Sequence, residues 1–209
     1  MMAVSVAPVS PAAAQDSLVL AADRGEIVVV RRLMAEGAAI NARDGRGRTA
    51  LLAATQRNHG EIARLLINEG ADVNVKDLAQ DSPFLYSSAE GMVEILKLTL
   101  RAGADLASVN RYGGTALIPA CHRGHVEAVK LLLATGIDKD HVNNLGWTAL
   151  LEAVILGDGG PRHTEIVRLL SAAGANVNLA DRDGMTPLTH ARQRGYAAIV
   201  SILEAAGAR

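Results

Sequence analysis

Two stretches of this 209-residue chain carry residue types that could do chemistry. The first, GDGGPRHTEIVRLL from Gly157 to Leu170, places glycines before an apolar, helix-like segment, as a phosphate-binding loop does. The second groups Cys121, His122 and His125, whose side chains are typical ligands of transition metals. Which of these stretches forms a site depends on the elements that hold them.

Those elements follow an internal repeat. Asp44, Asp77, Asn110 and Asn143 stand 33 residues apart, and similar segments such as DGRGRTALLAATQRNHGEIARLLINEGADVNVK follow each of them. A degenerate copy precedes Asp44, and a last copy ends the chain. We therefore expect one domain over residues 16–209 in six units, at residues 16–43, 44–76, 77–109, 110–142, 143–180 and 181–209.

Each unit carries the signals of two helices. A hydroxyl residue precedes an apolar run, where its oxygen can accept a hydrogen bond from the first turn of a helix; these residues are Thr49, Ser82, Thr115, Thr148 and Thr186. Residues suited to the left-handed end of a helix follow; they are Gly25, Asn58, Gly91, Gly124, Gly157 and Gly195. A second segment such as EIARLL or EAVKLL ends at a further glycine. The pattern predicts a turn, a short helix, a tight reversal and a longer helix in every unit.

With these features the chain resembles the ankyrin repeat family, whose signature is D-x-x-G-x-T-P-L-H-x-A, then G-H, then a leucine-rich helix closing in G-A. The TPLT and TALL segments, the 33-residue length and the GAxxN endings all match. The resemblance implies an all-α solenoid of helix–turn–helix units joined by β-hairpin-like turns, and a module that binds proteins. The family's histidine is missing, which puts some hydrogen bonds between repeats in doubt; its place is taken by Leu52, Leu85, Ile118, Leu151 and Thr189.

The register changes the interpretation of the glycine-rich stretch. Gly157 aligns with the helix-ending glycines and His163 with the histidine of the G-H pair, so residues 158–162 are an insertion. A phosphate-binding P-loop needs a lysine and a preceding strand, whereas the preceding LLEAVIL is helical in register. The stretch is therefore predicted to be an enlarged turn between two helices, without a nucleotide or other cofactor.

The register also separates the candidate metal ligands. Cys121 falls on a small, buried position of the first helix. Because packed helices stand about 8–10 Å apart, histidines of neighbouring units lie too far apart to share a metal, whose bonds to nitrogen are about 2 Å long. We expect His125 and its equivalents to cap the second helices. No serine is tied to a general base by this geometry, so we expect no metal ligand and no catalytic residue.

Binding residues are expected on the concave surface that turns and first helices form in a solenoid. The second unit is basic there, and the fourth and fifth units carry large apolar residues of the kind found at interface hot spots. The predicted partner-binding residues are Arg46, Arg48, Arg57, Tyr112, Arg123, Leu145, Trp147, Ile155 and Leu156. The apolar group would anchor a protein or peptide while the arginines steer its acidic edge. In a competing interpretation, Trp147 folds down to cover an alanine-rich core.

Composition limits the other classes of function. The net charge of −1 and the scattered arginines argue against nucleic acid as a partner. No apolar run approaches the roughly 20 residues that span a bilayer. The one cysteine excludes an internal disulfide and a cysteine-based zinc site. With five aromatic residues in the whole chain, small aliphatic side chains must fill the core, as closely packed helices allow.

Residues 1–15, MMAVSVAPVSPAAAQ, are small, apolar and uncharged. They fit the tail of a signal peptide that begins upstream, which implies a periplasmic or secreted protein, or a disordered leader, which implies a cytoplasmic one. The lysine-poor, alanine- and arginine-rich composition is typical of a bacterial source.

We expect a monomeric protein-binding scaffold that is not an enzyme. Two other classes of function stay open. One is a carrier of a small molecule or metal, using the enlarged 158–162 loop and the nearby histidine. The other is an enzyme subunit whose chemistry is supplied by its partner.

Overall fold

The computed structural model describes the backbone of residues 11–209 and the side chains from Leu18 onwards. Residues 1–10, which make up most of the expected leader, lie outside the described part. Its helices are α1 (Pro11–Arg24), α2 (Ile27–Ala35), α3 (Ala50–Gln56), α4 (Gly60–Asn68), α5 (Pro83–Ala89), α6 (Val93–Arg101), α7 (Leu117–His122), α8 (Val126–Leu133), α9 (Ala149–Ile155), α10 (Pro161–Ala172), α11 (Pro187–Gln193) and α12 (Ala197–Ala205).

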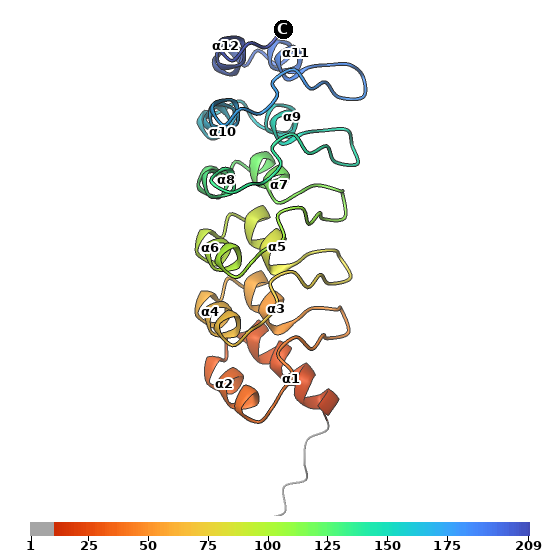
Figure 1. The fold of residues 1–209 in the computed structure, drawn as a ribbon, viewed down its shortest axis with the longest axis vertical. Coiled ribbons are helices and arrows are strands. Elements are labelled where there is room, and N and C mark those ends of the chain that lie inside the picture. Colours follow the sequence, from red (N-terminus) through yellow and green to blue (C-terminus); the bar gives the residue numbers. More distant parts are fainter. Residues whose placement is uncertain (1–10) are drawn as a thin grey trace, which may run out of the picture.

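The helices stack in pairs along one long axis (Figure 1). The odd-numbered helices form one column, the even-numbered helices form a second, and the turns between units project beyond the odd-numbered column (Figure 1). Residues 11–209 contain no strand, and their one β-bridge joins Val109 to Thr115. The predicted all-α solenoid with hairpin-like turns is therefore confirmed. The first helix begins at Pro11, so the last residues of the expected leader are helical.

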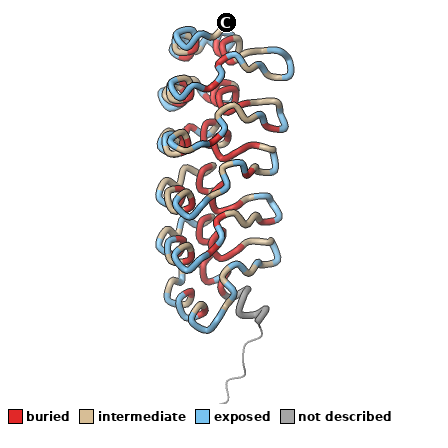
Figure 2. Tube along the Cα trace, viewed as in Figure 1, coloured by how far each residue is buried: buried red, intermediate tan, exposed pale blue. Residues whose placement is uncertain are grey.

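The core runs along the stack between the two columns of helices (Figure 2). It consists of two apolar clusters, one from Leu18 to Ile95 and one from Phe84 to Leu203, which overlap in sequence at the third unit. Apart from Phe84, the largest fully buried side chains are leucine and isoleucine, as the composition predicts. Cys121 is fully buried, which raises the pKa of its thiol. No helix of the described part is long and apolar enough to cross a membrane.

Four of the five predicted hydroxyl caps are confirmed. The hydroxyls of Thr49, Ser82, Thr148 and Thr186 each accept a hydrogen bond from the backbone N–H three residues later, at 3.2–3.3 Å. These bonds satisfy donors that have no partner inside the helix. The caps fix where the first helix of each unit begins, and so fix which of its side chains face the turns.

The prediction that Thr115 caps the first helix of the fourth unit is wrong. Helix α7 begins only at Leu117, and the buried Thr115 hydroxyl has no hydrogen-bond partner among the described residues. The cause is Pro119. In the second unit the equivalent residue, Ala53, donates its N–H to the carbonyl of Thr49, the cap residue. Proline has no N–H, and its ring crowds the carbonyl four residues earlier. The first turn of α7 instead closes through the N–H of Ile118, which donates to the Thr115 carbonyl at 3.2 Å.

Candidate functional site

A pocket of about 460 Å³ opens on the face made by the turns and the odd-numbered helices of the third, fourth and fifth units. We call it the central pocket. Its wall combines acidic, basic, aromatic and apolar side chains, which include Asp81, Tyr86, Glu90, Arg111, Tyr112, His122, Arg123, Leu145, Glu152 and Leu156.

The repeat explains how Tyr86 and Glu152 come to line this pocket. Both lie four residues after a cap, at the position that Pro119 and His190 occupy in other units. This position faces the turn of its own unit. Glu152 Oε1 accepts a hydrogen bond from Asn143 at 2.8 Å, and in the sixth unit His190 lies 2.7 Å from Asp181 in the same way.

Glu152 is a buried carboxylate without a cation. The residue is 6% exposed, and its second oxygen lies 3.7 Å from Nδ1 of His122. Burial raises the pKa of Glu152 above its usual value, against the effect of the Asn143 hydrogen bond. Burial lowers the pKa of His122, with further lowering by Arg123 and His163, which disfavours a positive charge on the imidazole beside Glu152.

Asp81 brings a second carboxylate to the pocket, from the turn of the third unit. Burial and the neighbouring Asp77 raise the pKa of Asp81, while Arg111 and Arg123 oppose the shift only through their charge. No described residue donates a hydrogen bond to its side chain. Asp81 and Glu152 thus line one pocket from units on either side of the fourth.

The arginines of the pocket are engaged elsewhere. Arg123 pairs with Glu90 and also donates to the carbonyl of Ala89 at 3.2 Å. The guanidinium of Arg111 lies 4.7 Å from the centre of the Tyr112 ring, a cation–π distance. Among the acidic groups of the pocket, Glu90 is paired with Arg123, whereas neither Asp81 nor Glu152 has a lysine or arginine at ion-pair distance among the described residues. Arg111 likewise makes no ion pair there.

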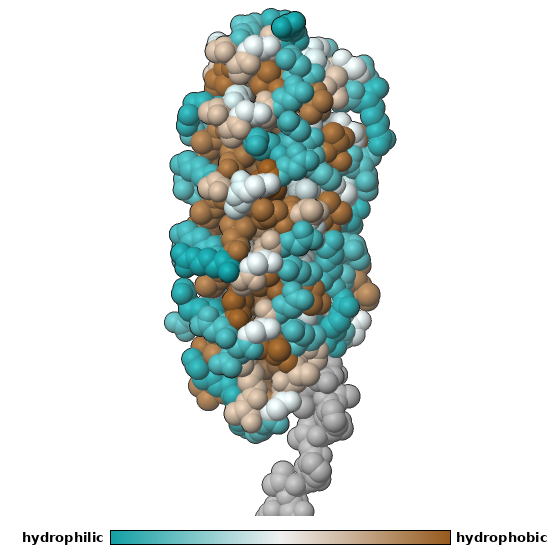
Figure 3. Space-filling model, in the orientation of Figure 1, coloured by the Kyte–Doolittle hydropathy of each residue, from teal (hydrophilic) through white to brown (hydrophobic). Residues whose placement is uncertain are grey.

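Large apolar side chains border this pocket on its solvent side. Tyr112 is 54% exposed, Leu145 49% and Leu156 42%, and we call these three the apolar rim. Figure 3 shows apolar side chains (brown) interrupting the hydrophilic surface at several heights of the stack. Of the other residues predicted beside them, Trp147 and Ile155 are half-buried and line no part of the pocket.

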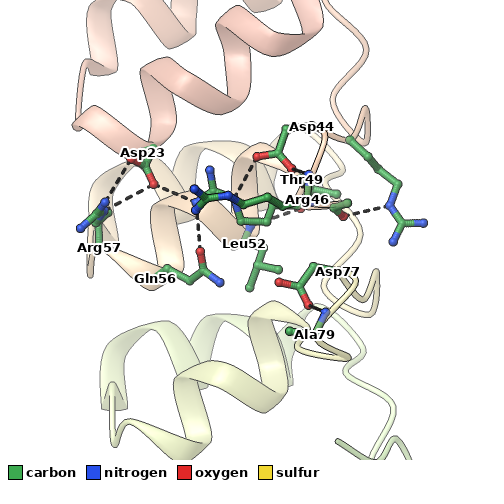
Figure 4. Close-up of polar contacts among 12 residues, drawn as sticks. Asp23, Asp44, Arg46, Thr49, Leu52, Gln56, Arg57, Asp77 and Ala79 are labelled. Atoms are coloured by element: carbon green, nitrogen blue, oxygen red, sulfur yellow. Dashed lines mark hydrogen bonds and ion pairs between the residues drawn. The ribbon is translucent and has the colours of Figure 1, made fainter. Parts of the chain in front are cut away.

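The predicted arginines of the second unit form a separate cluster (Figure 4). Arg48 is 14% exposed and makes ion pairs with Asp23 and Asp44, each at 2.9 Å. Arg57 is 61% exposed and reaches Asp23 at 3.4 Å. Arg46 is exposed. Burial alone would raise the pKa values of Asp23 and Asp44, but hydrogen bonds led by those from Arg48 outweigh it and lower them. The charge of Arg48 is therefore used within the chain.

The enlarged turn of the fifth unit is shorter than predicted. Pro161 and Arg162 belong to α10, where proline suits the first helical position. The left-handed backbone falls on Gly159, at φ 68°, and not on Gly157 as predicted. The Tyr196 hydroxyl donates to the Gly157 carbonyl at 3.0 Å, so the turn is packed against the sixth unit.

His125 occupies the N-terminal cap position of α8, as expected, but its side chain makes no capping hydrogen bond. His163 instead lies inside the first turn of α10. The Nδ1 atom of His163 lies 2.7 Å from the Asp158 carboxylate, and its Nε2 atom lies 2.8 Å from the carbonyl of His122. Over the described residues no three His, Cys, Asp or Glu side chains gather closely enough to hold a metal. The histidine and the turn hold units together, and nothing supports the carrier hypothesis.

The predicted partner-binding residues do not include four residues of the pocket wall, namely Asp81, Tyr86, Arg111 and Glu152. A signal for two of them exists: the position four residues after the cap changes its chemical type in every unit, from Ala53 to Tyr86 to Glu152. Because the residue type at this position differs from unit to unit, the fold does not fix it and it is open to function.

Comparisons with known proteins agree with this architecture. Models of ankyrin repeats match residues 9–77, 84–181 and 161–204. YahD of Escherichia coli (strain K12), described as an ankyrin repeat protein, is 49% identical over 57 residues, which are 27% of this chain and 28% of YahD. The chain thus matches less than a third of that relative's length.

Solved structures match over almost the whole chain. An ankyrin repeat domain from Acinetobacter baumannii AYE is 56% identical, with a TM-score of 0.90 over 92% of this chain and 98% of that one. The ankyrin repeat protein EF0377 is 40% identical, with a TM-score of 0.88 over 91% and 97%. The ankyrin repeat domain of Bcl-3, of the IkappaB family, is 28% identical, with a TM-score of 0.82 over 92% and 86%. The chain belongs to the ankyrin repeat family.

Proposed function

We propose that this chain is a non-catalytic module that binds another polypeptide on the concave face formed by its turns and odd-numbered helices. Ankyrin repeats are generally protein–protein interaction modules. The observation that carries the proposal for this chain is the apolar rim, where three large side chains stay between 42% and 54% exposed around a pocket. Exposed apolar groups next to a concavity are a usual mark of a docking site.

The remaining predicted residues fit this proposal with different roles. Arg123 lies on the pocket wall, beside the rim, and can exchange its contact with Glu90 for a contact with the partner. Arg46 and Arg57 lie a unit or more away on the same face, where they can steer an acidic edge of a longer partner. We propose that Trp147 and Ile155, both half-buried, support the rim from below. Arg48 supports the turn of the second unit.

The test is capture of binding proteins from the cells that make this chain, followed by titration of each purified captured protein in a calorimeter. The double variant Tyr112→Ala/Leu145→Ala removes two of the three rim side chains. Hot-spot side chains contribute about 2 kcal/mol or more each, so binding should weaken at least about 100-fold, and the melting temperature should stay close to that of the wild type.

Val28→Ala is the matched control, because Val28 is 77% exposed on α2, outside this face. Equal affinity of the rim variant and the control would contradict the proposal. A rim variant that loses binding only because it unfolds would show a large fall in melting temperature.

A further inference from the structure

We propose that the central pocket takes the side chain of a lysine or arginine from the partner polypeptide and holds it with the carboxylates of Glu152 and Asp81. This inference rests on the proposed function, because it states which residue of the partner the pocket selects.

Glu152 is the first reason. It is more than nine-tenths buried, lines the pocket, and uses one oxygen to accept from Asn143. Its other oxygen lies 3.7 Å from His122, beyond hydrogen-bond distance. A buried carboxylate with an unused acceptor is costly unless a cation or donor completes it. An ammonium or guanidinium group supplies both the charge and the N–H donors.

Asp81 is the second reason, since it belongs to a different unit and its carboxylate makes no hydrogen bond and no ion pair with the described residues. Two carboxylates on one pocket suit the fork of a guanidinium or the several donors of an ammonium. Tyr86, a further wall residue, offers an aromatic ring, and a cation gains from contact with such a face.

The charge balance selects a cation over an anion. Arg123 is paired with Glu90, and Arg111 lies over the Tyr112 ring. The pocket wall carries more carboxylates than guanidinium groups, namely Asp81, Glu90 and Glu152 against Arg111 and Arg123, so an acidic side chain would meet a net negative wall. A basic side chain meets two carboxylates that have no lysine or arginine at ion-pair distance.

The size of the pocket suits one side chain. Ligand pockets typically measure about 300–1,000 Å³, and at about 460 Å³ this one lies in the lower half of that range. A long, unbranched side chain fits such a space while the backbone that carries it remains outside. There the apolar rim is in position to contact the neighbouring residues of the partner.

The test uses blocked single amino acids, which carry the side chain and no second binding determinant. The Nα-acetyl N-methylamides of arginine, lysine, norleucine and glutamate are titrated into the ¹⁵N-labelled full chain while its amide signals are followed by NMR. Norleucine is the neutral counterpart of lysine. We expect saturable shifts of the amides around Tyr112 and Asn143 with arginine and lysine, and at least about ten-fold weaker binding of norleucine and glutamate.

Two variants locate the effect. Glu152→Gln keeps an oxygen for the Asn143 hydrogen bond, so its fold should survive, and its affinity for the arginine probe should fall about ten-fold or more. Asp81→Asn should weaken the same probe. Glu165→Gln is the control, because Glu165 lies in the same unit but on α10, where it pairs with Arg168.

Three results would overturn the inference. The lysine and norleucine probes could bind equally well, no probe could give saturable shifts, or both pocket variants could keep full affinity for the arginine probe. Its failure can be told apart from failure of the proposed function. If Tyr112→Ala/Leu145→Ala loses a captured partner while Glu152→Gln and Asp81→Asn keep it, only the pocket inference falls. If the probes bind the pocket but no polypeptide depends on the rim, the proposed function falls.

Discussion

The second unit and the central pocket use charged side chains of the same face in opposite ways. In the second unit Arg48 lies between Asp23 and Asp44 and is 14% exposed, so positive and negative charge come from the same chain. In the central pocket, Glu152 and Asp81 lack such a cation. The difference fits our proposal that complete charge pairs join units of the solenoid, whereas the incomplete ones serve a partner. Four predictions, in order of expected size, test this comparison.

The largest effect is expected from Arg48→Met. Removing the cation leaves Asp44 without an ion pair and Asp23 with only the exposed Arg57, which should lower the free energy of unfolding by about 3 kcal/mol. Arg46→Met, at an exposed neighbour, should change it by less than about 0.5 kcal/mol. Urea denaturation of both variants measures this, and equal stability of the two would show that the pair does not hold the unit.

The same variant has a pH signature. The pKa values of Asp23 and Asp44 are lowered in the folded chain, so the stability gained from Arg48 is present above the ordinary carboxyl pKa. It is lost as the pH falls through the lowered values. The difference in stability between wild type and Arg48→Met should therefore shrink on acidification, and a difference independent of pH would contradict an ionic origin.

The next effect concerns the turn of the fifth unit, which supports the pocket wall through His163 and the His122 carbonyl. A Cβ on Gly159 would be strained at φ 68° and would lie 2.4 Å from the Tyr196 ring. We expect Gly159→Ala to destabilise the chain by about 2–3 kcal/mol. Gly37→Ala, also left-handed but without a neighbour within 4 Å, should cost about 1 kcal/mol. Thermal unfolding of both variants separates the clash from the strain.

A smaller effect of opposite sign is expected from Glu152→Gln. The raised pKa of Glu152 means that the folded chain disfavours its charged carboxylate. This loss of stability is absent below the ordinary pKa of a glutamate and is complete above the raised pKa. The groups that face Glu152 are Asn143 from the turn and His122 and Cys121 from α7. At pH 7.5 the variant should be more stable than wild type by roughly 0.5–1 kcal/mol, and the gain should vanish near pH 4. A loss of stability at pH 7.5 would mean that an unseen cation already compensates Glu152.

The smallest effect is expected from Arg57→Ala. Arg57 is 61% exposed, and exposed ion pairs contribute between about 0 and 1 kcal/mol. We expect less than about 0.5 kcal/mol, which 0.5 M salt should remove. A loss as large as that of Arg48→Met would show that exposure does not separate the two arginines.

The fold could be predicted from the sequence because each repeat carries similar residues at the same spacing. The cap at Thr49 and the left-handed Asn58, at φ 58°, follow from residue type and spacing alone. The late start of α7 could have been predicted too, since Pro119 lacks the N–H that would donate to the carbonyl of Thr115, four residues earlier. The start of α10 at Pro161 also carried its own signal, a proline at the first helical position.

The site was less accessible. Arg48 and Asp23 are 25 residues apart, and only the stacking of units brings them together. The exposed Tyr112 and Leu145 follow from their register, but the burial of Glu152 depends on how neighbouring units close around it. Sequence register shows which side chains face the turns, whereas which of them lack a partner is a property of the packed structure.

Amide hydrogen exchange of the chain, free and bound to a captured partner, tests the central claim most directly. Our account predicts slower exchange in the turns and odd-numbered helices of the third to fifth units, at residues 78–90, 110–123 and 143–156. Protection along the even-numbered helices, with those three segments unchanged, would contradict it.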